Sequence, residues 1–297
     1  MKETLSDQID RLEKSFDNIE REAPFLKSAV KAFRGVMISR AALKARLPER
    51  SDIHISPPED SRFSEGIPWL TEQTITSFVD PWGDSVKSTI QPLLKAFPSI
   101  RLEISRTQEA FERGSIDLKY CIGALVEGRE EDIVMIANRL GFNPIVLKFI
   151  LGQILKPFVE KRAEELQPLI KDVPWQRGYC PICGSFPELS FLQGDEGQRW
   201  LKCSLCGYDW RFDRMTCPYC EEKNENKELI CVVGSEHKWL ELCHECHRYI
   251  VGIDLRKQGG IITDVAAIGM IHLDIIAQQK GFLPTAECAW NMVPPSN

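Results

Sequence analysis

Four Cys-x-x-Cys pairs between residues 180 and 246 constrain this 297-residue chain more than any other feature of its sequence. Nineteen residues separate the first pair from the second, and twenty-two separate the third from the fourth. Paired motifs at such spacing are typical of metal sites with four thiolate ligands. We therefore predict two metal centres. The first uses Cys180, Cys183, Cys203 and Cys206, and the second uses Cys217, Cys220, Cys243 and Cys246.

The chemistry of such pairs suits zinc or a single iron ion. A Cys-x-x-Cys turn, or knuckle, places two sulfurs on one side of the chain, and two facing knuckles give a tetrahedron of thiolates. A closed site of this kind leaves no open position for a substrate. A purely structural role for the metals is therefore as strong a prediction as a functional one. A thioredoxin-like dithiol is disfavoured, because it needs a helix that starts at the motif within a βαβ unit.

The cysteine region repeats itself. The first pair recurs after 37 residues and the second pair after 40, and Arg-Trp-Leu at 199–201 reappears as Lys-Trp-Leu at 238–240. This pattern predicts two copies of one small module with short strands, at residues 173–214 and 215–256. Each copy is too small for a stable apolar core, so metal binding is expected to decide whether it folds.

Residues 1–172 predict an all-helical domain, with apolar residues recurring every three or four positions. The clearest helix begins after Asn143, a good N-cap, with Pro144 at its first position. Pro157 is expected to kink this helix or to end its first half. Further helices are expected near residues 5–16, 23–47, 71–78, 83–97, 103–113 and 117–140, with a surface loop at 48–68.

Residues 257–297 are expected to form one amphipathic docking helix and a tail. The helix is predicted over 263–280, with Gly281 as its C′ residue and a frayed end at 294–297. The fold class that follows is α+β, with a helical N-terminal domain, two tandem modules of rubredoxin or zinc-ribbon type, and a C-terminal helix.

Composition and charge argue against several classes of function. The net charge is −6, and residues 173–256 hold 10 Lys and Arg against 13 Asp and Glu, whereas a zinc ribbon that binds nucleic acid is normally basic. The chain has no secretory signal at its start and no apolar run of 18 residues. We therefore expect a cytoplasmic protein without membrane insertion, in which paired cysteines bind metal and do not form disulfides.

The remaining histidines and cysteines near the motifs are expected to play supporting roles. His237, His244 and His247 crowd the second module, but four cysteines already complete its site, so surface or supporting positions are favoured. Cys231 is expected to be a buried strand residue, and a spare ligand for the second site is the alternative, since it lies close in sequence. Cys121 and Cys288 stand alone and are expected to be packing residues.

The four cysteine motifs and the segment that follows them resemble those of a family of formate dehydrogenase accessory proteins called FdhE. The resemblance lies in Tyr-Cys-Pro-Ile-Cys-Gly-Ser at 179–185, Leu-Lys-Cys-Ser-Leu-Cys at 201–206, Arg-Met-Thr-Cys-Pro-Tyr-Cys at 214–220, Cys-His-Glu-Cys at 243–246 and the segment 264–282. Thr263 departs from the family, in which an acidic residue is common before Asp264, and the histidine-rich second module is also unusual.

The resemblance implies a cytoplasmic accessory protein that is not an enzyme. It implies rubredoxin-like modules with iron at the eight cysteines, and a partner that is the catalytic subunit of a molybdenum- or tungsten-dependent formate dehydrogenase. The chain would bind this subunit as a chaperone and support its maturation. Zinc is the alternative metal. A rubredoxin-like electron-transfer protein and a zinc-ribbon nucleic-acid binder are the alternative functions, and the oligomeric state is left open.

Overall fold

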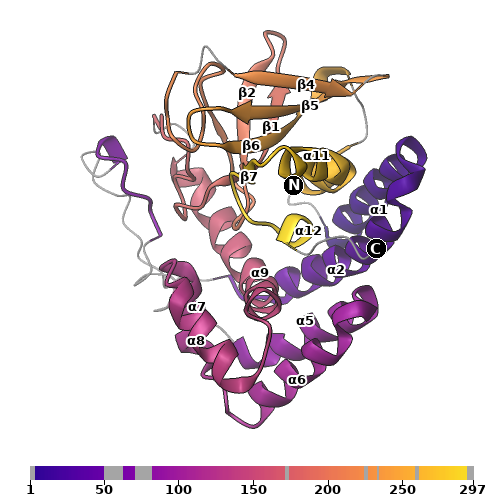
Figure 1. The fold of residues 1–297 in the computed structure, drawn as a ribbon, viewed down its shortest axis with the longest axis vertical. Helices are drawn as coiled ribbons and strands as arrows, with labels where there is room; N and C mark the ends of the chain where they lie inside the picture. Colours follow the sequence, from indigo (N-terminus) through magenta and orange to yellow (C-terminus); the bar gives the residue numbers. More distant parts are fainter. Residues whose placement is uncertain are drawn as a thin grey trace.

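The computed structural model describes residues 4–49, 63–70, 82–170, 174–223, 227–232, 234–257 and 261–292. In this part of the chain, helices come first, a sheet with seven strands follows, and short helices return at the end (Figure 1). This order confirms the predicted α+β class. The helix expected at 71–78 and the tail at 294–297 lie outside the described residues.

The N-terminal region is helical, as predicted. Its α-helices are α1 (Leu5–Glu22), α2 (Lys27–Arg46), α5 (Trp82–Ala96), α6 (Arg101–Glu112), α7 (Leu118–Val126), α8 (Glu130–Leu140) and α9 (Pro144–Ile170). Among the described residues of this region, two 3₁₀ turns lie between these helices, η1 (Pro24–Leu26) and η2 (Pro98–Ile100). Helix α9 begins as expected, because the N–H of Ile145 donates to Asn143 Oδ1 at 2.9 Å. Side-chain caps of this kind satisfy N–H groups that have no partner within the helix.

Helix α9 continues past Pro157, so this proline does not end the helix. Packing on two sides explains the continuity. Leu147, Leu151 and Leu155 belong to one apolar core, and Phe149 and Ile154 belong to another. An interior proline costs about 3 kcal/mol, whereas each buried aliphatic or aromatic side chain contributes about 1.5–3 kcal/mol. Burial along the whole helix therefore outweighs one lost hydrogen bond.

The sheet joins both cysteine-rich modules. Its strands are β1 (Pro187–Gln193), β2 (Gln198–Cys203), β3 (Asp209–Arg211), β4 (Glu228–Val232), β5 (Ser235–Cys243), β6 (Arg248–Asp254) and β7 (Leu283–Pro284). They lie in the order β3-β2-β1-β6-β5-β4, with β7 paired to β6. Strands β1 and β6 are parallel, with Ser190 opposite Gly252. Each expected module thus contributes three strands, and the first strand of one pairs with the last strand of the other.

The C-terminal helix is broken, so the prediction of one continuous helix over 263–280 is wrong. The structure has α10 (Thr263–Ala266), the 3₁₀ turn η4 (Ala267–Met270) and α11 (Ile271–Gln279), followed later by α12 (Ala289–Met292). All four residues of η4 are buried. Gly269 lies against helix α1, where an added Cβ would stand 3.2 Å from the Ile19 side chain. The tighter turn lets consecutive apolar residues enter the core, which a regular helix presents on one face only.

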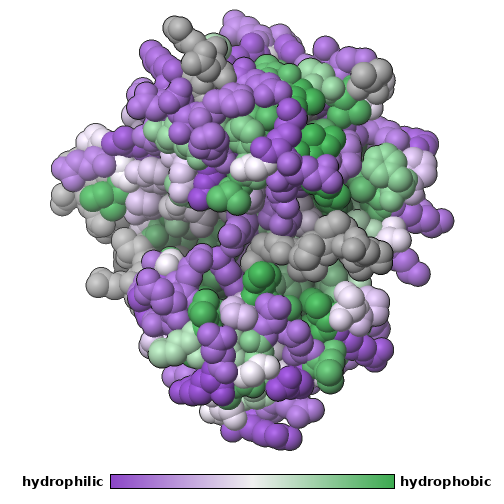
Figure 2. Space-filling view, viewed as in Figure 1, coloured by the Kyte–Doolittle hydropathy of each residue, from purple (hydrophilic) through white to green (hydrophobic). Residues whose placement is uncertain are grey.

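The apolar surface of these elements is directed inward. One core joins α1, α2 and the α10–α11 segment to the sheet, and another joins α7, α8 and α9 to the first module. Figure 2 shows mostly hydrophilic side chains on the face it draws, with hydrophobic ones in small groups. Within the described residues, no single helix is long and apolar enough to span a membrane, although α8 and α9 together, bent by 116°, meet that length and composition.

A buried carboxyl group fixes α11 on the sheet. The hydroxyl of Tyr249 in β6 donates to Asp274 Oδ1 at 2.8 Å, and Asp274 is buried. Burial raises the pKa of Asp274 to about 7, while the Tyr249 hydrogen bond opposes this rise. In the unfolded chain the pKa of an aspartate is about 3.9.

The stability of the fold is therefore expected to fall as the pH rises from about 4 to about 7. Over that range the unfolded chain loses the Asp274 proton while the folded chain keeps it, which favours unfolding. Urea denaturation across this range tests the effect. Asp274→Asn, which stays neutral, is expected to flatten this part of the profile. An unchanged profile in the variant would contradict the assignment to Asp274.

Candidate metal centres

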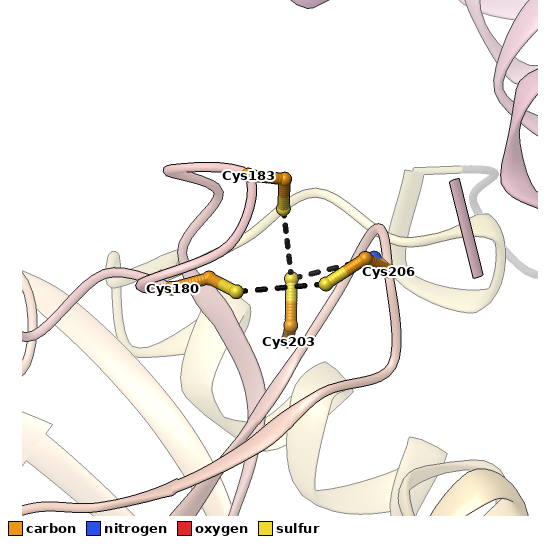
Figure 3. Close-up of side chains that lie close together, drawn as sticks. All are labelled: Cys180, Cys183, Cys203 and Cys206. Atoms are coloured by element: carbon orange, nitrogen blue, oxygen red, sulfur yellow. Dashed lines mark hydrogen bonds between the residues drawn. The ribbon is translucent and has the colours of Figure 1, made fainter. Parts of the chain in front are cut away.

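The first four-cysteine cluster lies at one end of β1 and β2. Cys180 and Cys183 form the knuckle before β1, and Cys203 and Cys206 form the knuckle after β2 (Figure 3). The sulfur of Cys180 is 3.5 Å from that of Cys206, and the sulfur of Cys183 is 3.4 Å from that of Cys203. The N–H of Ile182 donates to the Cys180 sulfur at 3.4 Å. Such donors stabilise negative charge on the sulfurs.

The second cluster repeats this arrangement, with Cys217 and Cys220 in the knuckle before β4, and Cys243 and Cys246 in the knuckle between β5 and β6. The Sγ atoms of Cys217 and Cys246 are 3.8 Å apart, as are those of Cys220 and Cys243. Tyr219 N–H donates to the Cys217 sulfur at 3.4 Å. In each cluster the four sulfurs lie within 4.8 Å of one another, and among the described residues no histidine joins either group. The structure thus brings together each predicted set of four cysteines.

All four knuckles share one backbone conformation. The residue after the second cysteine is left-handed in each of them: Gly184 (φ 75°), Gly207 (φ 70°), Glu221 (φ 57°) and His247 (φ 53°). Glycine adopts this conformation readily, because it has no Cβ. Non-glycine residues such as Glu221 and His247 rarely adopt a positive φ, so nothing in their type indicates it. The repeat is therefore more regular in the backbone than in the sequence.

The donor set fits a tetrahedral metal ion. With metal–sulfur bonds of about 2.3 Å, the edge of a tetrahedron is about 3.8 Å, close to the sulfur separations in both clusters. All eight cysteines are free thiols in the structure and form no disulfide. Burial raises the pKa of the Cys180 and Cys206 thiols well above its usual value. Four thiolates can therefore share this buried space only around a cation.

Lysine side chains support the first cluster from both sides of its second knuckle. Lys156 of α9 donates to the carbonyl of Ser204 at 2.7 Å, and Lys202 donates to the carbonyl of Gly207 at 2.9 Å. Lys202 also pairs with Asp264 at 3.0 Å. Burial of Lys202 lowers the pKa of its ammonium group, whereas Asp264 and other acidic neighbours raise it. The acidic neighbours outweigh burial, so Lys202 stays charged. Sequence reasoning missed both lysines, because no local pattern marks a buried cation.

Other predicted residues fall into two groups. Cys121 and Cys288 are buried, as expected of packing residues. Cys231 is exposed, so its predicted burial is wrong. It lies in β4, which ends the strand order of the sheet, and alternate residues of that strand face outward. His244 lies at the surface, with Nε2 3.1 Å from Glu228 Oε2, in the supporting position expected of it.

The two modules meet where the chain enters the first knuckle. The N–H of Gly178 donates to Glu221 Oε1 at 2.9 Å, and Arg177 pairs with the same carboxylate at 3.1 Å. A Cβ at Gly178 would overlap the backbone of Pro218 in the third knuckle. This contact leaves no room for any side chain at position 178.

Gly178→Ala is therefore expected to destabilise the protein by about 1–3 kcal/mol or more, because overpacking against backbone forces the knuckles apart. Thermal denaturation followed by circular dichroism measures the loss. Gly152→Ala in α9 is the control, since no atom lies within 4 Å of a Cβ there. That control is expected to be neutral or stabilising by up to about 1 kcal/mol. Equal stabilities of the two variants would contradict the close contact.

The chain is similar in sequence to known proteins that are named FdhE. The family model described as FdhE, central domain, matches residues 179–214. The FdhE homolog of Aquifex aeolicus is 30% identical over 261 residues, which cover 81% of this chain and 89% of that protein. The chain belongs to the FdhE family. The resemblance predicted from the cysteine motifs is thus confirmed.

Two further FdhE proteins agree with this assignment. Protein FdhE of Escherichia coli (strain K12) is 29% identical over 119 residues, covering 36% of this chain and 35% of that protein. The crystal structure of the FdhE protein from Pseudomonas aeruginosa matches with a TM-score of 0.69 and 18% identity, over 100% of this chain and 99% of that one. The helical region, the sheet and the C-terminal segment are therefore one FdhE fold.

Proposed function

We propose that this chain is a cytoplasmic accessory factor, and not an enzyme, that binds the catalytic subunit of a molybdenum- or tungsten-dependent formate dehydrogenase and supports its maturation. Membership of the FdhE family, over most of the chain, is the observation that carries the proposal. The closed four-sulfur geometry of both clusters also supports it, because such sites hold the chain in shape without binding a substrate.

The eight cysteines would hold two metal ions, one in each cluster. Iron is the ion that the family resemblance favours, and zinc is the alternative. Bound iron would supply one-electron chemistry, whereas zinc would supply none. The residues of this chain fix four thiolates at tetrahedral spacing in either case. Anaerobic purification, metal analysis and an absorption spectrum distinguish the two metals, because iron–thiolate bands colour the protein and zinc does not.

Capture of the client tests the proposed function. A tagged full-length chain is expressed in its host during growth on formate, and the proteins bound to it are identified by mass spectrometry. We expect the formate dehydrogenase catalytic subunit to be enriched at least tenfold over a tagged control of unrelated fold. A host that lacks this chain is expected to make the subunit in inactive form. Recovery of no formate dehydrogenase subunit, together with normal activity in that host, would overturn the proposal.

A further inference from the structure

The two clusters differ in how deeply they lie in the protein. Cys180, Cys203 and Cys206 belong to the core that includes α9, and Cys183 packs against it. In the second cluster Cys220 and Cys246 are half-buried, and its four cysteines belong to none of the three cores found in the described residues. An acceptor in solution can therefore approach two half-buried cysteines of the second cluster, whereas in the first cluster only Cys183 is half-buried, and it packs against a core.

Both knuckles of the first cluster are anchored by the helical region. Trp69 N–H donates to the carbonyl of Pro181 at 2.9 Å, and Leu70 N–H donates to that of Ile182 at 2.6 Å. The second knuckle is held by Lys156 and Lys202, as described above. Both ammonium groups are buried, and their positive charge favours a cluster of four thiolates around a divalent ion, which carries a net negative charge. Separation of these sulfurs requires the core itself to open.

The fourth knuckle, in the second cluster, is held by a short strap, residues 282–284. Leu283 N–H donates to the carbonyl of His247 at 3.0 Å, and Arg248 donates to the carbonyl of Pro284 at 2.8 Å. The Phe282 ring lies 5.3 Å from that of His244 and 5.8 Å from that of His247. Leu283 itself is 58% exposed. The strap forms a strand of only two residues, so its release breaks few backbone hydrogen bonds, and of its three side chains only Phe282 belongs to a core.

We propose that the second centre is an exchange site for a thiophilic divalent cation, while the first centre retains its ion for as long as the fold persists. In the exchange, the cation passes from four thiolates to the ligands of an acceptor, and the thiolates take up protons or a new cation. No atom changes its oxidation state. The strap limits the rate, because it closes the knuckle that carries Cys243 and Cys246. This assignment goes beyond the accessory function and holds whether or not the chain binds a formate dehydrogenase.

Metal release from the zinc-loaded full-length chain tests the proposal. The metallochromic chelator 4-(2-pyridylazo)resorcinol is added in excess, and its zinc complex is followed by absorbance. We expect two phases of one equivalent each, with rates that differ at least tenfold. Cys220→Ser is expected to remove the fast phase and keep the slow one. A single rate for both ions, no release before unfolding, or a fast phase that survives in Cys220→Ser would overturn the proposal.

Two matched variants separate the anchors. Phe282→Ala is expected to speed the fast phase at least threefold and to leave the slow phase unchanged. Lys156→Met is expected to speed only the slow phase. Leu229→Ala, an exposed position in β4, is the control and is expected to change neither. A thermal melt of each variant confirms that it is folded, and the Cys220→Ser result decides the assignment even where Phe282→Ala does not fold. Acceleration of the slow phase by a folded Phe282→Ala variant would also count against the strap.

Discussion

Replacing Cys203 with serine is expected to remove one equivalent of bound metal and to prevent the sheet from folding at 37 °C. The Cys203 sulfur lies 3.4 Å from that of Cys183 and accepts N–H groups of its own knuckle, so serine would disrupt both the ligand set and the turn. A structural zinc site contributes about 10–16 kcal/mol to the folding of small peptides. That figure is comparable with the whole stability of a typical domain, about 5–15 kcal/mol.

Metal content and far-ultraviolet circular dichroism measure this effect together. Removal of metal from the unaltered chain by a strong chelator under denaturing conditions is expected to prevent refolding in the same way. Cys231→Ser provides the control, because Cys231 is exposed and lies in neither cluster. It is expected to keep both equivalents and to change stability by less than about 0.5 kcal/mol. A folded Cys203→Ser protein with two bound ions would show that the clusters are not metal sites.

Arg199→Ala is expected to lower the free energy of unfolding by about 3–5 kcal/mol, the usual cost of breaking a buried ion pair. The Arg199 side chain is 2% exposed, and its Nη2 lies 3.1 Å from Glu241 Oε1 in the other module. Its Nη1 donates to the carbonyls of Asp213 and Thr216 at 3.0 and 2.9 Å. The guanidinium thus joins β2, the segment between the modules and β5. Alanine would leave the carbonyls and part of the charge on Glu241 without a partner.

Urea denaturation, with the midpoint and slope fitted together, measures this loss. Arg211→Ala in β3 is the matched control, since Arg211 is an exposed arginine in a neighbouring strand and is expected to change stability by less than about 0.5 kcal/mol. Arg199→Lys is expected to recover only part of the loss. A planar guanidinium can donate to the Glu241 carboxylate and to the backbone carbonyls at the same time, whereas a single ammonium group cannot. A loss below about 1 kcal/mol in Arg199→Ala would show that the pair does not hold the modules together.

Local sequence signals predicted the parts of this protein that local chemistry determines. The cysteine sets follow from spacing, and the start of α9 follows from Asn143 and Pro144. Glycine at position 281 has the positive φ of 86° that was expected at the end of the C-terminal helix. In each case a few neighbouring residues restrict the backbone or set the spacing of the cysteines. Metal binding by these cysteines, the identity of the metal and the domain boundaries stay predictions.

The features that were missed depend on residues far apart in the chain. Strand β6 pairs with β1, and no local pattern at Gly252 or Ser190 indicates which partner a short strand will choose. The break of the C-terminal helix reflects contact of Gly269 with Ile19 of α1. The exposure of Cys231 follows from the position of β4 at the end of the sheet. Each of these is decided by tertiary packing, which overrides the local preference.

The parallel pairing of β1 with β6 has a consequence for synthesis of the chain. The pairing partners Ser190 and Gly252 are 62 residues apart, so β1 leaves the ribosome well before its partner strand exists. At about 5–20 residues per second, the nascent chain displays an open strand edge for several seconds. An unpaired edge is a template for other strands. The helices made earlier are available in that interval, and their packing on the first module would shield the growing protein from aggregation until β6 arrives.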